Sequence, residues 1–158
     1  MHIFLDESFN LKDRTKLQFI SISGFATTDV KKIWKKWKSA RRKFVGKWRI
    51  HATDKVFEKL RQKCFSIVAN TPEIYILSVK QSLSSLPTGK SSPYYRKSSL
   101  NFDKVYEDLI RSLLDNMNLN NYKDVIITID NRKTKGGLLG KMKIYSRILA
   151  YLKQYYPT

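Results

Sequence analysis

The chain has 158 residues, enough for one domain with a buried core, and its 42% share of hydrophobic residues excludes a largely disordered protein. Its 31 Lys and Arg against 13 Asp and Glu give a formal net charge of +18, so nucleic acid is the expected partner, because each neutralised phosphate releases counterions. No apolar run approaches the roughly 20 residues of a membrane span, and a single cysteine excludes an internal disulfide, so we expect a cytoplasmic protein with no membrane partner.

The first half of the chain predicts two strands followed by two helices. An apolar run at 2–5 and an alternating, β-branched stretch at 17–26 are typical of strands joined by a hairpin connection. The next segment, at about 29–45, predicts a helix with an apolar stripe and a surface rich in Lys and Arg. A short strand at 47–50 and a helix capped by Thr53 are expected to follow.

The second half alternates strands and helices around one long loop. Residues 73–79 predict a strand, and the Ser-rich stretch at about 81–99 has Pro and Gly without periodicity, which is typical of a loop. An amphipathic helix begins at Phe102, and the apolar run at 125–129 predicts a strand buried on both faces. The apolar stripe expected for the last helix is Leu138, Met142, Tyr145, Leu149, Leu152 and Tyr156.

This order of elements predicts one α/β domain over residues 1–158, with a mixed sheet and helices on both of its faces. With the helix at about 29–45 treated as a basic insertion, the order is similar to that of the ribonuclease H fold. The apolar character of the strands at 2–5 and 125–129 also predicts that the first strand is central, paired with the second strand and adjacent to 125–129.

Two aspartates follow the two apolar strands. Asp6 comes after the first strand, and Asp130 ends the strand at 125–129. Sites in α/β sheets form at the carboxyl ends of strands, so the two carboxylates converge if these strands are parallel neighbours. Carboxylate oxygens suit Mg²⁺ or Mn²⁺, which activate water in phosphodiester hydrolysis. The alternative is that each aspartate only ends a strand or caps a turn, and the pattern does not decide between the two.

Other residues near these positions are weaker candidates. His51 lies just before an expected helix, where it could serve as a metal ligand or as a general acid/base. The alternative is a polar residue in a turn, and this alternative is favoured because a single isolated His is weak evidence for a site. The loop at 131–137 lacks the spacing of a nucleotide-binding P-loop. Trp34 and Trp37 have helical spacing, so we interpret them as core residues rather than base-stacking platforms. The residues expected to contact phosphates are Arg41, Arg42, Lys47, Arg49, Lys55, Arg132, Lys133 and Lys135.

Short motifs along the chain resemble the domain-of-unknown-function family 3800. The opening strand reads HIFLDES, positions 49–54 read RIHATD and positions 125–132 read VIITIDNR. The resemblance implies a ribonuclease-H-like fold and a nuclease-related activity in which acidic residues bind a divalent metal. Carried over by position, it implies the site residues Asp6, Glu7, His51 and Asp130, with Asp6, Glu7 and Asp130 as metal ligands.

The leading hypothesis is therefore a divalent-metal-dependent nuclease acting on DNA or RNA, in which Glu7 or His51 assists proton transfer. The alternative is a non-catalytic basic nucleic-acid-binding module on the same fold that has lost part of the acidic site. Two departures from the family favour this alternative, since Arg49 stands where the family has Glu and the family's C-terminal acidic motif is missing from the sequence. A protein-interaction domain is a third hypothesis, and a homodimer is kept as an alternative to a monomer.

Overall fold

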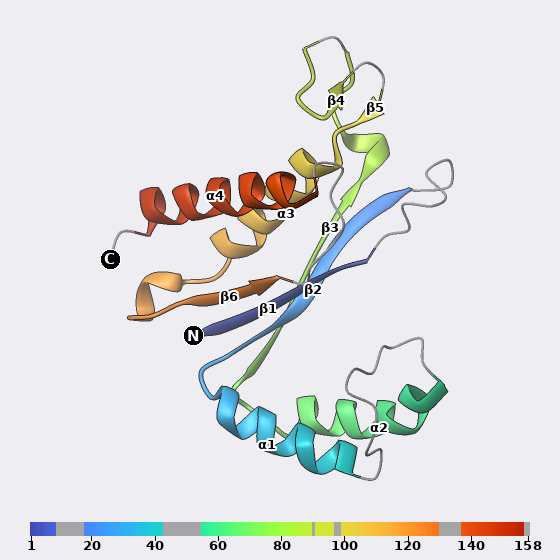
Figure 1. The fold of residues 1–158 in the computed structure, drawn as a ribbon, viewed down its shortest axis with the longest axis vertical. Coiled ribbons are helices and arrows are strands. Elements are labelled where there is room, and N and C mark those ends of the chain that lie inside the picture. Colours follow the sequence, from blue (N-terminus) through green and yellow to red (C-terminus); the bar gives the residue numbers. More distant parts are fainter. Residues whose placement is uncertain (9–17, 43–54, 90, 97–98, 130–136, 157–158) are drawn as a thin grey trace.

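A computed structural model describes residues 1–8, 18–42, 55–89, 91–96, 99–129 and 137–156. These residues form an α/β structure in which a mixed four-stranded sheet lies between two pairs of helices (Figure 1). No helix in these ranges combines the length and the apolar character needed to cross a membrane. The strand expected at 47–50 and the cap expected at Thr53 lie outside the described residues.

The sheet has the strand order β3-β2-β1-β6. Strand β1 is antiparallel to β2 and parallel to β6, and β2 is antiparallel to β3. The first strand is therefore central, as expected, between the second strand and the strand near 125–129. The strands are β1 (His2–Ser8), β2 (Phe19–Thr27), β3 (Ile74–Ser82) and β6 (Ile126–Ile129).

The Ser-rich segment expected as a loop at about 81–99 is partly ordered into short elements. Strand β3 continues to Ser82, and one 3-10 turn follows at Leu83–Ser85. Strands β4 (Tyr95–Arg96) and β5 (Ser99–Leu100) then form a separate two-stranded sheet. Backbone hydrogen bonds form these short elements, and such bonds do not depend on the hydrophobic periodicity that the segment lacks.

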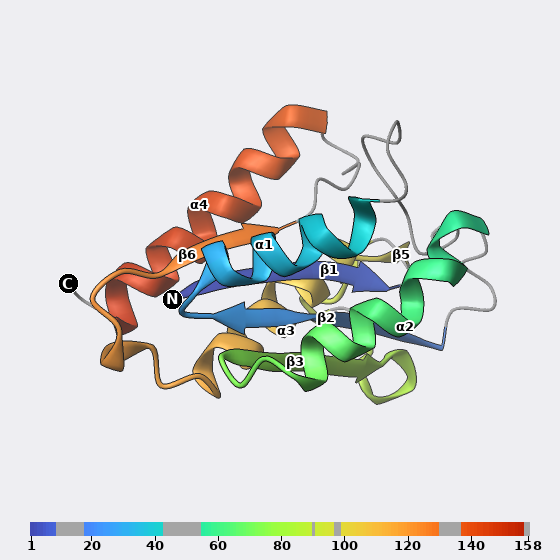
Figure 2. The same cartoon turned by 90° about the horizontal axis from the view of Figure 1, so that it is seen from below.

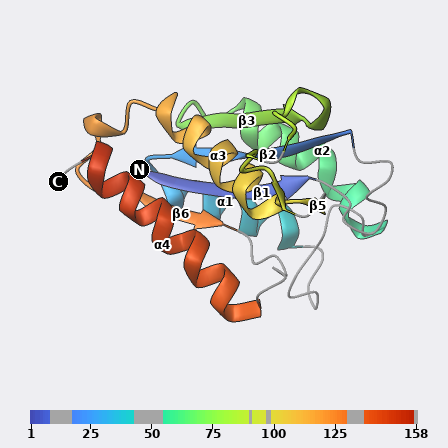
Figure 3. The same cartoon turned by 90° about the horizontal axis from the view of Figure 1, so that it is seen from above.

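Each face of the sheet carries two helices. Helices α1 (Val30–Arg41) and α2 (Lys55–Ala69) lie over one face (Figure 2), and α3 (Phe102–Asp115) and α4 (Gly137–Tyr155) lie over the other (Figure 3). Asp29 begins α1 as its N-cap, since its side chain accepts a hydrogen bond of 2.9 Å from the backbone N–H of Lys32.

The main core lies between the sheet and α3. Alternate residues of a strand point to opposite faces, so Ile3 and Leu5 of β1 lie on the α3 side while Phe4 lies on the α1 side. Gly24 of β2 faces Leu5, and a side chain at this position would overlap the backbone carbonyl of Phe4. The buried members of this core are Ile3, Leu5, Ile20, Ile22, Ala26, Leu86, Val105, Tyr106, Leu109, Ile110, Leu113, Leu114, Leu119 and Ile148.

Helix α1 differs from the expectation, because it has no buried residue. Trp34 is 51% exposed and Trp37 is only partly buried. The interpretation of Trp34 as a core residue is therefore wrong. The apolar stripe of α1 is real, but it borders an open pocket beside α2 instead of entering the core.

Strand β6 and helix α4 also differ from the expected burial. Ile126 of β6 is 51% exposed, so this edge strand is not buried on both faces. In α4, Tyr145 and Leu149 of the expected stripe are exposed, whereas Ile148 and Tyr151 are buried. The buried side of α4 is set by its contact with α3, where Arg147 and Tyr151 meet polar side chains.

Candidate functional site

The carboxyl end of β6 lies beside the middle of β1, which continues to Ser8. Asp6, expected just after the first strand, therefore lies within β1, because β1 stays paired with β2 beyond its last partner in β6. Leu5 of β1 is the register partner of Ile129 of β6, and the two strands are parallel. Asp6 follows Leu5 directly, and Asp130 follows Ile129 in the sequence. The register thus supplies the adjacency on which a shared acidic site depends. Asp130 and His51 themselves lie outside the described residues.

Strand β1 separates the carboxylates of Asp6 and Glu7. Asp6 is exposed on the face that also carries Phe4, because these residues are two apart in the strand. Glu7 is half-buried on the opposite face, where the hydroxyl of Tyr106 in α3 donates a hydrogen bond of 3.4 Å to Oε2. The structure therefore does not bring Glu7 beside Asp6, although sequence reasoning had grouped both as metal ligands.

Asp6 belongs to a polar row that crosses three strands. It is the register partner of Ser23 in β2, and Ser23 is the partner of Ser78 in β3. The two serine hydroxyls are 3.0 Å apart, which confirms that they share a face. Hydroxyls of this kind can donate hydrogen bonds to phosphate oxygens. Neither serine stands out in the sequence, since only strand register shows that they align with Asp6.

A metal site needs at least one residue beyond those described. Within the described ranges, no three His, Cys, Asp or Glu side chains are grouped closely enough to hold an ion. The donor chemistry nevertheless suits a hard divalent cation, since Asp6 presents an exposed carboxylate beside the strand that leads to Asp130.

Helices α1 and α2 form a strongly basic pair. Helix α1 contains six Lys and Arg and no Asp or Glu, and α2 contains four against the single acid Glu58. Of the residues expected to contact phosphates, Arg41 is half-buried while Arg42 and Lys55 are exposed on these segments. The others lie outside the described residues: Lys47, Arg49, Arg132, Lys133 and Lys135.

Two lysines of α1 hold the helix in place. Lys32 forms an ion pair with Glu73 just before β3, and this hydrogen bond is the main reason that the pKa of Glu73 lies below its ordinary value. Lys36 donates hydrogen bonds to the Asn70 carbonyl oxygen at 2.8 Å and to Thr71 Oγ1 at 2.6 Å. These contacts attach one side of α1 to the turn between α2 and β3.

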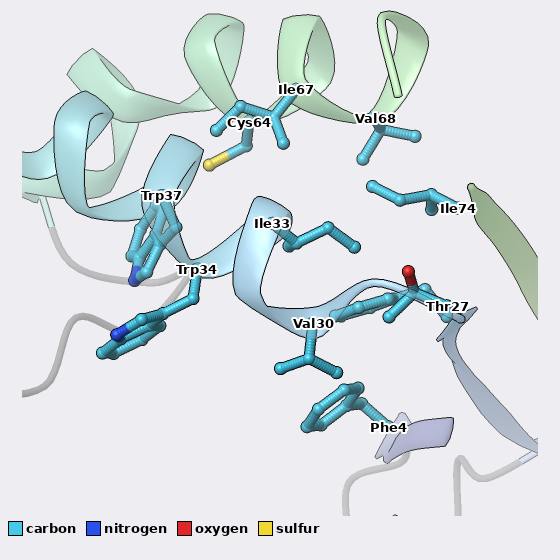
Figure 4. A pocket seen from close by; sticks show the side chains of 11 residues that line it. Phe4, Thr27, Val30, Ile33, Trp34, Trp37, Cys64, Ile67, Val68 and Ile74 are labelled. Atoms are coloured by element: carbon cyan, nitrogen blue, oxygen red, sulfur yellow. The ribbon is translucent and has the colours of Figure 1, made fainter. Parts of the chain in front are cut away.

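An apolar pocket of about 380 Å³ lies between α1, α2 and the sheet (Figure 4). Trp34 and Trp37 lie at one end of this pocket, and Phe4 of β1 lies toward the other end. Cys64 of α2 also lines the pocket, and burial raises the pKa of its thiol. The thiol is therefore a protonated, weakly polar wall group at neutral pH rather than a nucleophile.

The fold and these features define a basic α/β protein with an acidic strand end and an aromatic pocket on one face of its sheet. Searches against protein-family models, curated proteins and solved structures find no match to this chain.

Proposed function

We propose that the chain is a divalent-metal-dependent nuclease with a ribonuclease-H-like fold. The observation that carries the proposal is the parallel pairing of Leu5 with Ile129, which puts the residues that follow them at one edge of the sheet. The strand order β3-β2-β1-β6, with helices on both faces, is compatible with that fold. The resemblance of the motifs around Asp6, His51 and Asp130 to family 3800 supports the same activity.

In this proposal Asp6 and Asp130 hold Mg²⁺ or Mn²⁺ beside the carboxyl end of β6, where the pairing of β1 with β6 ends. When bound, such an ion lowers the pKa of a coordinated water and stabilises the leaving oxygen of the phosphodiester. His51 accepts the proton of the attacking water. Glu7, the other base expected from the sequence, lies on the opposite face of β1 from Asp6 and contacts Tyr106, so it is not assigned this role. Ser23 and Ser78 hydrogen-bond to the phosphate oxygens of the substrate, and the basic side chains neutralise its backbone.

The metal site can be tested without knowing the substrate. The change Asp6→Asn keeps the shape of the side chain and removes one charged ligand. We expect Mn²⁺ to raise the Tm of the wild-type protein, because an ion at 100 times its Kd adds about 2.7 kcal/mol to the free energy of unfolding. The Tm of Asp6→Asn should not change when Mn²⁺ is added. Without metal, Asp6→Asn should be at least as stable as wild type, because a repulsion between Asp6 and Asp130 is removed.

The matched control is Asp124→Asn, which removes an exposed carboxylate shortly before β6, at the amino end of that strand and far from its carboxyl end. This variant should keep both the Mn²⁺ effect and any metal-dependent cleavage of a labelled DNA or RNA. An Asp6→Asn protein that retains both would show that the ion is not bound at this strand end. A wild-type protein that does not respond to Mn²⁺ would contradict the metal-dependent mechanism.

The second candidate is a non-catalytic nucleic-acid-binding module. One observation favours it, namely that the described acids form no three-ligand group while α1 and α2 carry a dense positive charge. Under this alternative, the protein binds nucleic acid in a salt-sensitive way but shows neither Mn²⁺ stabilisation nor cleavage.

A further inference from the structure

We propose that the pocket beside Trp34 binds an unstacked base, and that the nucleic acid recognised by this protein is single-stranded. This inference names the kind of substrate for the proposed nuclease. It rests on the proposed function only for the step that connects base binding to cleavage. Binding itself involves α1, α2 and the sheet, and it requires no metal.

The outer side of α1 combines an exposed indole with exposed cations. Trp34 is three residues from Lys31 and four from Lys38, and Lys35 is four from Lys31 and three from Lys38, so the four residues share one broad stripe of the helix. Trp34 is 51% exposed, although its indole is large and apolar. The three lysines form no ion pair within the described part of the chain, whereas Lys32 on another side of the helix pairs with Glu73.

Cations lie close to both tryptophan rings of α1. Lys38 Nζ is 5.3 Å from the centroid of the Trp34 ring, and the guanidinium carbon of Arg41 is 5.8 Å from that of Trp37. An aromatic surface surrounded by Lys and Arg is the combination that binds single strands, since the ring stacks on a base while the cations neutralise the adjacent phosphates.

The pocket has the size and lining of a binding site for a small planar group. Its volume of about 380 Å³ lies within the range of small-ligand pockets, and its walls are almost entirely apolar or aromatic. A base in a duplex stays stacked between its neighbours and cannot enter such a pocket without an unstacking cost. A single strand presents its bases freely, so the pocket favours a single-stranded ligand.

An anionic membrane is attracted by the same lysines, but the shape of the site argues against it. Interfacial helices bury a continuous apolar face that projects into the lipid. Here the apolar residues face a concavity between two helices and a sheet (Figure 4), while α1 presents the exposed cations Lys31, Lys35 and Lys38 beside Trp34.

The pocket lies on the same face of β1 as the carboxylate of Asp6. Phe4 lines the pocket, and Asp6 lies two residues further along β1 on the same face. Two strand residues span about 7 Å. A single strand with one base in the pocket can therefore extend along β1 toward Asp6, which would place a phosphodiester at the proposed metal site.

The test compares three probes in EDTA, so that no cleavage occurs. They are a short oligothymidylate, an abasic strand of equal length, and the duplex of the oligothymidylate with its complement. We expect wild type to bind the oligothymidylate most tightly. Trp34→Ala should weaken this binding by roughly 5- to 150-fold and leave the abasic strand unaffected, because only stacking is lost.

Two further variants control for structure. Trp34→Phe should retain most of the affinity, since a phenyl ring still stacks. Tyr155→Ala removes an exposed aromatic ring from α4, on the opposite face of the sheet, and should leave all three affinities unchanged. Circular dichroism and Tm establish that each variant is folded.

Several results would overturn the inference. These are a folded Trp34→Ala variant with unchanged oligothymidylate affinity, an equal loss for the abasic strand, or a duplex bound as tightly as the single strand. Trp34-dependent binding to phosphatidylglycerol vesicles, without Trp34-dependent binding to oligothymidylate, would identify a membrane site instead. The binding measurements in EDTA do not depend on a metal site at Asp6. The metal-dependent nuclease and the base-binding pocket can therefore be contradicted independently of each other.

Discussion

Glu107 is the buried carboxylate that joins α3 to α4. Its side chain is 4% exposed and forms ion pairs with Arg111 of α3 at 2.5 Å and with Arg147 of α4 at 3.2 Å. The Arg111 guanidinium also lies 5.0 Å from the ring centroid of Tyr151, whose hydroxyl donates to Asp115. A buried charge is costly unless it is paired, so these contacts determine how α4 can lie against α3.

We expect Glu107→Gln to lower the free energy of unfolding by roughly 1–3 kcal/mol, because it leaves two arginines without a charged partner. Urea unfolding measures the change. The control is Glu58→Gln, which breaks an exposed pair with Arg61 and should cost about 0–1 kcal/mol. Equal effects of the two substitutions would show that burial does not strengthen the Glu107 network.

At the scale of elements, α1 is held by polar contacts rather than by a buried apolar face. It contributes no buried residue, and Lys32 and Lys36 attach it to Glu73, Asn70 and Thr71. The position of α1 over the sheet therefore depends on charged groups that respond to pH. This matters for the proposed function, since α1 carries one wall of the Trp34 pocket.

The Glu73 carboxyl has a pKa below its ordinary value, first because Lys32 hydrogen-bonds to it. A lowered folded-state pKa means that the contribution to stability is complete above the ordinary pKa and is lost as the pH falls through the lowered value. We expect wild type to lose more stability than Glu73→Gln between about pH 6 and pH 3. Urea unfolding at both pH values measures this difference, and Glu58→Gln should behave like wild type. Parallel losses in all three proteins would contradict a role for the Lys32–Glu73 pair.

At the scale of the whole molecule, the net charge of +18 attracts polyanions from all directions, but its distribution is uneven. Helix α1 carries six of the cations without an acid, and its outer lysines lack ion-pair partners among the described residues. Helix α3, by contrast, pairs Lys104 with Asp108 and Arg111 with Glu107. Nucleic acid is therefore expected to bind on the α1 side of the sheet.

Salt dependence distinguishes this local surface from a general effect of charge. We expect the logarithm of the oligothymidylate affinity to fall linearly with the logarithm of salt concentration. Replacing Lys35 and Lys38 with Gln should reduce the magnitude of the slope by about 1.4, or about 0.7 for each lost phosphate contact. Replacing the exposed Lys123 and Lys153 on the α4 side removes the same net charge and should leave the slope unchanged. Equal changes in both double variants would indicate diffuse attraction without a defined surface.

Much of the architecture could be predicted from the sequence, because it depends on local periodicity. The apolar run after His2 and the alternation after Phe19 predicted β1 and β2, and the 3.6-residue spacing after Phe102 predicted α3 with its buried side. The central place of β1 beside β6 was also predicted correctly from its apolar character, although β6 itself is an edge strand that is not covered on both faces. Asp6 and Glu7 were expected to end the first strand, but both lie within β1, because its pairing with β2 continues to Ser8.

Only the tertiary structure decided which apolar surfaces are covered. The periodicity of α1 and α4 shows an apolar side but not the partner that buries it, so Trp34 and Leu149 were expected inside and are exposed. The alignment of Asp6 with Ser23 likewise follows from strand register, and Asp6 and Glu7 point to opposite faces because the pairing of β1 with β2 extends the strand to Ser8. The physical reason is that a helix or strand pattern depends on residues a few positions apart, whereas burial and site geometry depend on how distant segments dock.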